Sequence, residues 1–312
     1  MYEEMSRKSR LVRALVAEFN SNKRLTEKYS ANSYGKSDMD EEFRYPEHLN
    51  AEKIFLNEES EDKKFEMELL TWKDSTSPWV ILHFHGGGYV GAMRRHYKRM
   101  AGLYSEVGHG ATVLTVDYRV APEHPFPAAL EDARESYDWL LEQGYKEEQI
   151  IVAGDSAGGG LAMAMCHSLK SEDRKLPAGI VAMSPWADLT TSGASYKDNY
   201  DIDPVFGNER SELIFDNPYI GDADPSDPRI SPLYGDFDGF PPMLIQSGTD
   251  EMLLSDSESV AEKAKAAGVK VRFTKYPGMF HVFQMAGTIM DESKSAWAEV
   301  RRFLEEILTL SS

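Results

Sequence analysis

The stretch IIVAGDSAGG, residues 150–159, decides the fold of this chain of 312 residues. It begins as an apolar run typical of a buried strand and continues into helical spacing through Leu161, Met165 and Leu169. Ser156 lies where the two patterns meet, with one glycine two residues before it and another two residues after it. This is the G-x-S-x-G elbow, a sharp strand-to-helix turn with no space for side chains at its glycines. The stretch therefore predicts an exposed serine nucleophile beside the N–H groups of a helix start.

Strand-like apolar runs alternate with helical patterns on both sides of this turn. Further strands are expected near residues 53–57, 64–72, 79–84, 111–118, 179–184, 242–247 and 269–276, and helices near 95–107, 128–142, 255–267 and 291–308. Short apolar strands that alternate with helices are typical of an α/β fold, in which a mostly parallel sheet has helices on both faces.

Two segments depart from this alternation. Residues 1–48 are polar with helical spacing, and residues 188–238 are rich in Asp, Pro and Gly, with a helix expected near 208–215. A long insertion in a regular chain is usually functional. We expect residues 1–48 to form N-terminal cap helices and residues 49–312 to form the catalytic domain, with residues 188–238 as an inserted cap segment.

Composition argues against several classes of partner. The net charge of −18 argues against nucleic acid and anionic membrane surfaces. No apolar run reaches the ~18 residues that cross a bilayer, and the charged N-terminus lacks the apolar core of a secretory signal. The single cysteine, Cys166, rules out an internal disulfide. We expect a cytoplasmic protein without stable membrane insertion.

A serine hydroxyl needs a base within hydrogen-bond reach and an acid that orients the base. In this class of fold the acid and then the histidine follow the serine, each in a loop after a strand. His281 fits the base, because it lies in PGMFHVF, residues 277–283, just after the last predicted strand. His83 and His85 alternate along one strand, but no further ligand follows at metal-binding spacing, so no metal is expected.

The acid is expected in the loop after the strand that ends at Gly248, where Asp250 and Glu251 stand side by side. Spacing alone does not choose between these two. Asp256 lies further along, where it suits the positive end of the next helix. Asp155, beside the nucleophile, is expected to make a structural or cap-contacting hydrogen bond instead.

The run HGGG at residues 85–88 follows a buried strand. Backbone N–H donors stabilise the oxygen of a tetrahedral intermediate by a few kcal/mol each in a water-poor site. Three glycines let the main chain approach a substrate closely, so this run is expected to supply such donors.

Six motifs together resemble the bacterial hormone-sensitive-lipase-like esterases, the family IV lipolytic enzymes of the α/β-hydrolase fold. They are HGGGY at 85–89, DYRVAPEHPFPAALED at 117–132, GDSAGG at 154–159, SPWADLT at 184–190, DPRISPLYGD at 227–236 and GMFHVF at 278–283. The resemblance runs from about residue 50 to the C-terminus. It implies an ester hydrolase with a Ser-His-acid triad, no cofactor, a cap over the site and a homodimer.

The resemblance also implies roles for particular residues. The oxyanion hole would consist of the N–H groups of Gly87, Gly88 and Ala157. Many relatives carry the acid three residues after the strand-ending glycine, which favours Glu251, with Asp250 as the alternative. Asp117 and Arg119 are expected to form a structural polar pair beneath the site.

The sequence is thus interpreted as a carboxylesterase that hydrolyses small esters with short acyl chains. Aromatic residues of the two cap segments are expected to shape the substrate pocket: Tyr34, Phe43, Tyr45, Trp186 and Phe206. A lactone hydrolase, an amidase or an N-deacetylase would use the same triad. A non-catalytic small-molecule receptor is the remaining alternative, although such receptors lack the histidine that His281 provides here.

Overall fold

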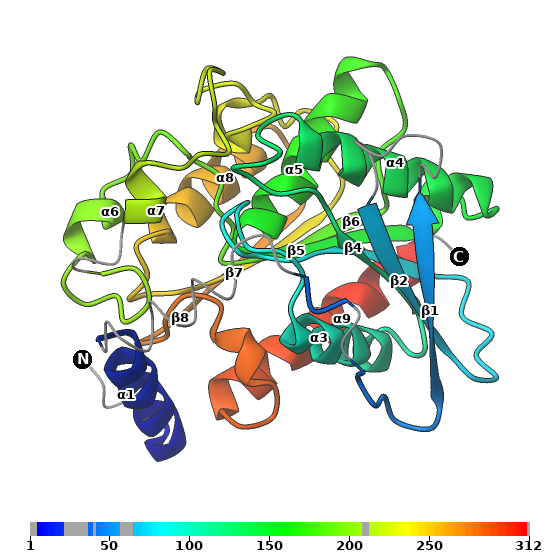
Figure 1. The fold of residues 1–312 in the computed structure, drawn as a ribbon, viewed down its shortest axis with the longest axis horizontal. Helices are drawn as coiled ribbons and strands as arrows, with labels where there is room; N and C mark the ends of the chain where they lie inside the picture. The colour runs from blue at the N-terminus through cyan, green and yellow to red at the C-terminus, as the bar shows by residue number, and fades with distance from the viewer. Residues whose placement is uncertain (1–4, 22–36, 40–41, 57–64, 208–211, 311–312) are drawn as a thin grey trace.

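A computed structural model describes residues 5–21, 37–39, 42–56, 65–207 and 212–310 (Figure 1). The strands are β1 (Leu49–Leu56), β2 (Phe65–Trp72), β3 (Val80–Phe84), β4 (Thr112–Asp117), β5 (Ile150–Asp155), β6 (Gly179–Met183), β7 (Met243–Gly248) and β8 (Val271–Tyr276). The α-helices are α1 (Arg7–Ser21), α3 (Arg95–Val107), α4 (Ala128–Glu142), α5 (Ala157–Ser171), α6 (Ser195–Asp198), α7 (Glu212–Phe215), α8 (Leu254–Ala266) and α9 (Asp291–Leu310). Short 3₁₀ turns are η2 (Glu147–Gln149), η4 (Pro232–Tyr234) and η5 (Phe283–Ala286).

All eight strands form one sheet in the order β1-β2-β4-β3-β5-β6-β7-β8. The hairpin β1–β2 is antiparallel and joins β4 in antiparallel register, whereas β4, β3, β5, β6, β7 and β8 run parallel. Every residue of the central strands β3, β5, β6 and β7 is buried, while the edge strand β1 is largely exposed. Helices on both faces explain why the central strands are continuous apolar runs. The predicted α/β fold is confirmed.

The two faces of the sheet carry separate hydrophobic cores. Alternate residues of a strand point to opposite faces, so on β5 Val152 joins one core and Ile151 joins the other. The first core packs against α4, α5 and α8, and the second packs against α3 and α9. Figure 1 shows α4 and α5 above the sheet, with α3 and α9 below it.

The loops that carry Ser156, Glu251 and His281 follow β5, β7 and β8. Because these strands run parallel, all three loops lie at the same edge of the sheet. The N-terminal helix α1 lies beside the segment that follows β8 (Figure 1), although 255 residues, 22–276, separate the end of α1 from the start of that segment. Residues 195–198 and 212–215 are helical within the inserted segment, and residues 208–211 of the helix expected there lie outside the described residues.

The division into cap segments and catalytic domain stays a prediction. Within the described ranges, no helix combines the length and the apolar character needed to span a membrane.

Candidate active site

Ser156 occupies the turn between β5 and α5 in a conformation that non-glycine residues rarely adopt, with φ of 53° and ψ of −123°. Its N–H donates to Met183 O at 2.9 Å, and its carbonyl accepts from Trp186 N–H at 2.8 Å. A Cβ on Gly154 would lie 2.3 Å from Gly158 O, so a side chain does not fit there. The surrounding backbone therefore holds the strained serine in place, as the elbow motif requires.

His281 is the second member of the group, and it lies in the loop between β8 and η5. Its Nε2 is 2.9 Å from Ser156 Oγ. The next residue, Val282, is β-branched yet has a φ of 49°, and its N–H donates to Ser184 Oγ at 3.1 Å. Ser184 and the strained Val282 backbone thereby fix the direction in which the imidazole points.

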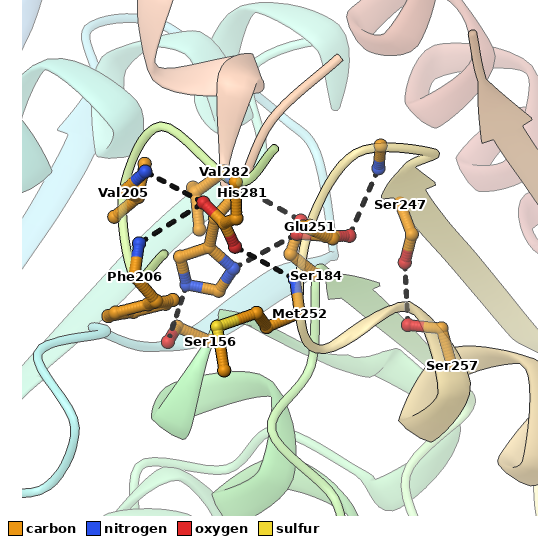
Figure 2. Close-up of polar contacts among 12 residues, drawn as sticks. Ser156, Ser184, Val205, Phe206, Ser247, Glu251, Met252, Ser257, His281 and Val282 are labelled. Carbon is orange, nitrogen blue, oxygen red and sulfur yellow. Dashed lines mark hydrogen bonds and ion pairs between the residues drawn. The ribbon is translucent and has the colours of Figure 1, made fainter. Parts of the chain in front are cut away.

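Glu251 completes a chain of hydrogen bonds that Figure 2 shows. Its Oε2 lies 3.0 Å from His281 Nδ1, and its Oε1 accepts from Gly248 N–H at 3.0 Å. The side chain is fully buried. Because the carboxylate accepts the Nδ1 proton, the Nε2 lone pair faces the serine hydroxyl, which is the tautomer a general base needs.

Asp250 points away from this chain. Its Oδ2 lies 3.1 Å from Arg13 Nη2, and its Oδ1 accepts from Thr249 Oγ1 at 2.9 Å. The structure therefore brings Glu251, and not the alternative acid, to the histidine. Asp256 has partners besides the positive end of the helix that was expected for it. Its Oδ2 accepts hydrogen bonds from the N–H groups of Ala187 and Asp188 at 2.9 and 2.8 Å.

Two carbonyl groups of the glycine loop after β3 accept hydrogen bonds from side chains. Tyr118 Oη donates to His85 O at 2.6 Å, and Asn217 Nδ2 donates to Gly88 O at 2.9 Å. Gly87 and Gly88 have φ of 118° and 63°, which glycine adopts without strain. Both line the same cavity as Ser156, and Ala157 follows at the start of α5, so their N–H groups are suited to an oxyanion near Ser156 Oγ.

Asp155 is completely buried behind this loop. Tyr97 Oη donates to its Oδ2 at 3.4 Å, and the Gly86 N–H also donates to this carboxyl. Burial raises the pKa of Asp155 to about 7, against the opposing influence of His85 and His281. Asp155 thus makes the expected structural hydrogen bonds, and the one from Gly86 connects it to the glycine loop.

The cavity above Ser156 has a volume of about 700 Å³, which is in the range of small-molecule sites. Trp186 and Phe206 line it, as predicted, and the Phe206 ring lies 4.7 Å from the His281 ring. Phe43 and Tyr45 do not belong to its lining, and this part of the pocket prediction needs correction. These two rings stack edge to face at 4.7 Å, and Tyr45 donates to Glu68 on β2. Tyr34 lies outside the described residues.

A second correction concerns Arg119, whose expected partner was Asp117. The guanidinium instead binds Asp132 on α4, with Nη2 2.7 Å from Oδ1, and also binds Glu131 at 3.1 Å. Asp117 accepts the Met93 N–H at 2.8 Å. The motif at residues 117–132 contains a turn followed by the start of α4. Arg119 therefore pairs with acids on this helix and not with Asp117, its near neighbour in the sequence.

Sequence reasoning missed the residues that join the inserted segment to the acid loop. Asp203 is buried and accepts the N–H groups of Val205, Phe206 and Met252 at 2.7, 3.1 and 2.8 Å. Asn199 Nδ2 donates to Glu251 O at 2.8 Å. No local pattern marks the contacts to the acid loop, since Asp203–Met252 and Asn199–Glu251 join residues 49 and 52 positions apart.

Potential metal ligands are not clustered in the part of the chain that the structure describes: no group of three or more His, Cys, Asp or Glu side chains is gathered there as a metal site requires. The hydrogen-bonded chain at Ser156 consists of one hydroxyl, one imidazole and one carboxylate, with backbone donors nearby. This set suits nucleophilic acyl transfer.

Comparison with known proteins agrees with this chemistry. A family profile described as the alpha/beta hydrolase fold matches residues 81–285. An esterase of Acinetobacter venetianus is 40% identical over 225 residues, which cover 72% of this chain and 74% of that protein. An acetyl-hydrolase of Streptomyces hygroscopicus is 35% identical over 246 residues, which cover 76% of this chain and 82% of that protein.

Solved structures extend the similarity to nearly the whole chain. The crystal structure of an esterase from the bacterial hormone-sensitive lipase family superposes with a TM-score of 0.81 at 32% identity. The alignment covers 96% of this chain and 98% of that one. A hormone-sensitive lipase from a metagenome library gives a TM-score of 0.82 at 34% identity, with the same two coverages.

Proposed function

The chain belongs to the hormone-sensitive-lipase-like esterases of the α/β-hydrolase fold, which are carboxylic ester hydrolases, and from that premise we propose that Ser156, His281 and Glu251 cleave short-chain esters through an acyl-enzyme. The observation that carries the proposal is the continuous hydrogen-bond chain from Glu251 Oε2 through His281 to Ser156 Oγ, with steps of 3.0 and 2.9 Å.

In the first half of the reaction, His281 Nε2 takes the proton of Ser156 as Oγ attacks the ester carbonyl. Negative charge develops on the carbonyl oxygen, which the N–H groups of Gly87, Gly88 and Ala157 stabilise. Glu251 stabilises the imidazolium that forms and keeps its ring in place. The imidazolium then protonates the leaving alcohol, and the acyl group remains on Ser156.

In the second half, His281 takes a proton from water, and the resulting nucleophile attacks the acyl carbonyl. The tetrahedral intermediate forms in the same oxyanion hole. Its collapse releases the carboxylic acid and returns the proton to Ser156 Oγ. Protons and electrons balance without a cofactor, so the proposed reaction consumes only ester and water.

The test compares wild type with Ser156→Ala on p-nitrophenyl butyrate and on matched ester, lactone and amide panels. We expect the esters to be the best substrates, and the variant to lose on the order of a million-fold in kcat. Undiminished turnover in the variant would reject Ser156 as nucleophile. Faster turnover of lactones or amides than of esters would redirect the substrate proposal and leave the triad in place.

The remaining expectations from the sequence belong to the same proposal. A homodimer is tested by light scattering on the purified chain. A cytoplasmic location is tested by fractionation of cells that express it.

A further inference from the structure

Arg13 on α1 reaches three segments that surround the triad. Its Nη2 lies 3.1 Å from Asp250 Oδ2 in the acid loop and donates to Ile202 O in the inserted segment at 2.8 Å. Its Nη1 lies 3.5 Å from Gly278 O in the histidine loop. Both charged side chains are well buried, with 13% of Arg13 and 4% of Asp250 exposed. A guanidinium fork can bind several acceptors at once, which an ammonium cannot do in the same geometry.

Asp250 lies in the loop that carries Glu251 and is also hydrogen-bonded to the loop that carries His281. Its backbone N–H donates to Met279 O at 3.0 Å, two residues before the catalytic histidine. Thr249 Oγ1 donates to the Asp250 carboxylate at 2.9 Å and accepts the Gly278 N–H at 2.8 Å. A Cβ on Gly248 would lie 2.2 Å from Met279 O. The two loops therefore pack as one unit, and the Asp250 carboxylate forms the ion pair of this unit with Arg13.

Other hydrogen bonds that the structure describes between the N-terminal segment and distant parts of the fold lie nearer the two ends of α1. Ser6 N–H and Ser9 Oγ donate to Glu292 at the start of α9. Asn20 Nδ2 donates to Pro204 O at 2.9 Å. Arg13 lies between these attachments, so it fixes the middle of the helix against the triad loops.

The middle of α1 is also the part that forms a wall of the cavity. Val12, Val16 and Phe19 line the cavity together with Ile289. Val12 and Val16 pack on a core cluster that contains Phe280, the residue before the catalytic histidine. Because Ser156 and these side chains line one cavity, a long ester chain that extends from Ser156 toward α1 would pack against this apolar wall.

We infer that Arg13 is a positioning residue: through Asp250 it seats α1 against the acid and histidine loops and thereby determines how strongly the cavity favours long over short ester chains. This inference rests on the proposed ester hydrolysis at Ser156. It gives Asp250 a role that differs from that of its neighbour Glu251. The Arg13–Asp250 pair positions the cavity wall that α1 forms, whereas the Glu251–His281 pair serves the transfer of the Ser156 proton.

The experiment measures kcat and KM for two series, p-nitrophenyl acetate against octanoate and ethyl acetate against octyl acetate. The variants are Arg13→Met, which keeps much of the side-chain volume, Asp250→Asn, and the double variant. Each CH₂ buried against α1 contributes roughly four-fold, so loss of contact with two of them lowers the long-to-short ratio of kcat/KM roughly fifteen-fold. We expect that fall in at least one series, mainly through KM.

Three comparisons separate this role from a general loss of structure around the site. Ser9→Ala removes an attachment of α1 that is remote from the triad loops, and it should leave the ratio unchanged. If Arg13 and Asp250 act through one contact, the double variant should show the ratio of a single variant, not the product of two effects. Arg13→Lys keeps the charge without the fork and should recover part of the ratio. Arg13→Lys also replaces Arg13→Met in the test if Arg13→Met does not fold.

The inference is overturned if the ratio is unchanged in both series for folded Arg13 and Asp250 variants, or if Ser9→Ala lowers it equally. It is also overturned if the effects of the two single variants multiply in the double variant. Failure of the proposed function has a different signature, in which wild type hydrolyses none of the esters. Melting temperatures recorded for every variant show that the assays use folded protein.

Discussion

The choice of acid is tested by replacing each neighbouring carboxylate with its amide. Glu251→Gln and Asp250→Asn each remove one negative charge and change almost no volume. In the wild type, Glu251 Oε1 accepts from Gly248 N–H at 3.0 Å and Oε2 faces His281 Nδ1 at 3.0 Å. A glutamine must divide these two tasks between one oxygen and one NH₂ group.

The two orientations of that glutamine differ in cost. If its NH₂ faced Gly248 N–H, two donors would meet in a fully buried place, at a cost of about 1–3 kcal/mol. The NH₂ therefore faces His281 Nδ1, which must then accept. The imidazole proton moves to Nε2, which is 2.9 Å from Ser156 Oγ, and the base can no longer take the serine proton. The comparable exchange in a serine protease lowers kcat about 10⁴-fold, or about 5.5 kcal/mol.

The assay is the initial rate of p-nitrophenyl acetate hydrolysis at saturating substrate, with both variants checked by thermal unfolding. We expect Glu251→Gln to lose between about 10³ and 10⁴ in kcat. Asp250 makes no hydrogen bond to the imidazole in the described structure, since it faces Arg13 and Thr249. Its variant should lose less than about ten-fold. If the order of the two losses is reversed, the assignment of Glu251 as the acid is refuted.

Three further predictions concern the site's supports. Burial and Asp188 raise the pKa of the Asp256 carboxyl well above its ordinary value, so the folded state keeps a proton that the unfolded state releases above pH ~4. The stability of the wild type then falls as the pH rises. The melting temperature of Asp256→Asn minus that of the wild type should therefore increase from about pH 5 to 8. A decrease in this difference over the same range would contradict the prediction. Gly87→Ala places a Cβ 2.8 Å from Gly91 O at a φ of 118° and should lower kcat about 10²–10³-fold. Gly144→Ala, which has a φ of 93° and no atom within 4 Å, is the control that should keep kcat, and equal losses would contradict the oxyanion role. Asp203→Ala leaves three N–H groups without their acceptor, among them the buried Met252 N–H, and should lower the melting temperature more than Asp203→Asn. Equal shifts would contradict the structural role of Asp203.

The elbow and the histidine were predictable because their signals are local. The glycine before Ser156 is required by a contact within the turn itself, where a Cβ on Gly154 would lie 2.3 Å from Gly158 O. Strand and helix patterns around the elbow fix which loops follow parallel strands, and those loops meet at one edge of the sheet. His281 is found by the same reasoning, since it follows the last strand directly.

The acid was not predictable from spacing because Asp250 and Glu251 differ only in the direction of their side chains. That direction depends on the contact of Gly248 with Met279, two segments 31 residues apart. Phe43 and Tyr45 were assigned to the pocket for their aromatic character, but their place is set by Glu68 on β2 and by Arg95, which stacks over the Phe43 ring at 5.7 Å. Arg13 has no motif around it, and its partners lie far along the chain.

The central claim is that the imidazole of His281 activates Ser156 as a nucleophile, and covalent labelling tests it most directly. Diethyl p-nitrophenyl phosphate is incubated with the wild-type chain, and intact mass with peptide mapping locates the adduct. We predict one equivalent of p-nitrophenol released and one diethylphosphoryl group on Ser156, with labelling greatly slowed in His281→Ala. An adduct on another residue, or none on a chain that still hydrolyses esters, would contradict the account.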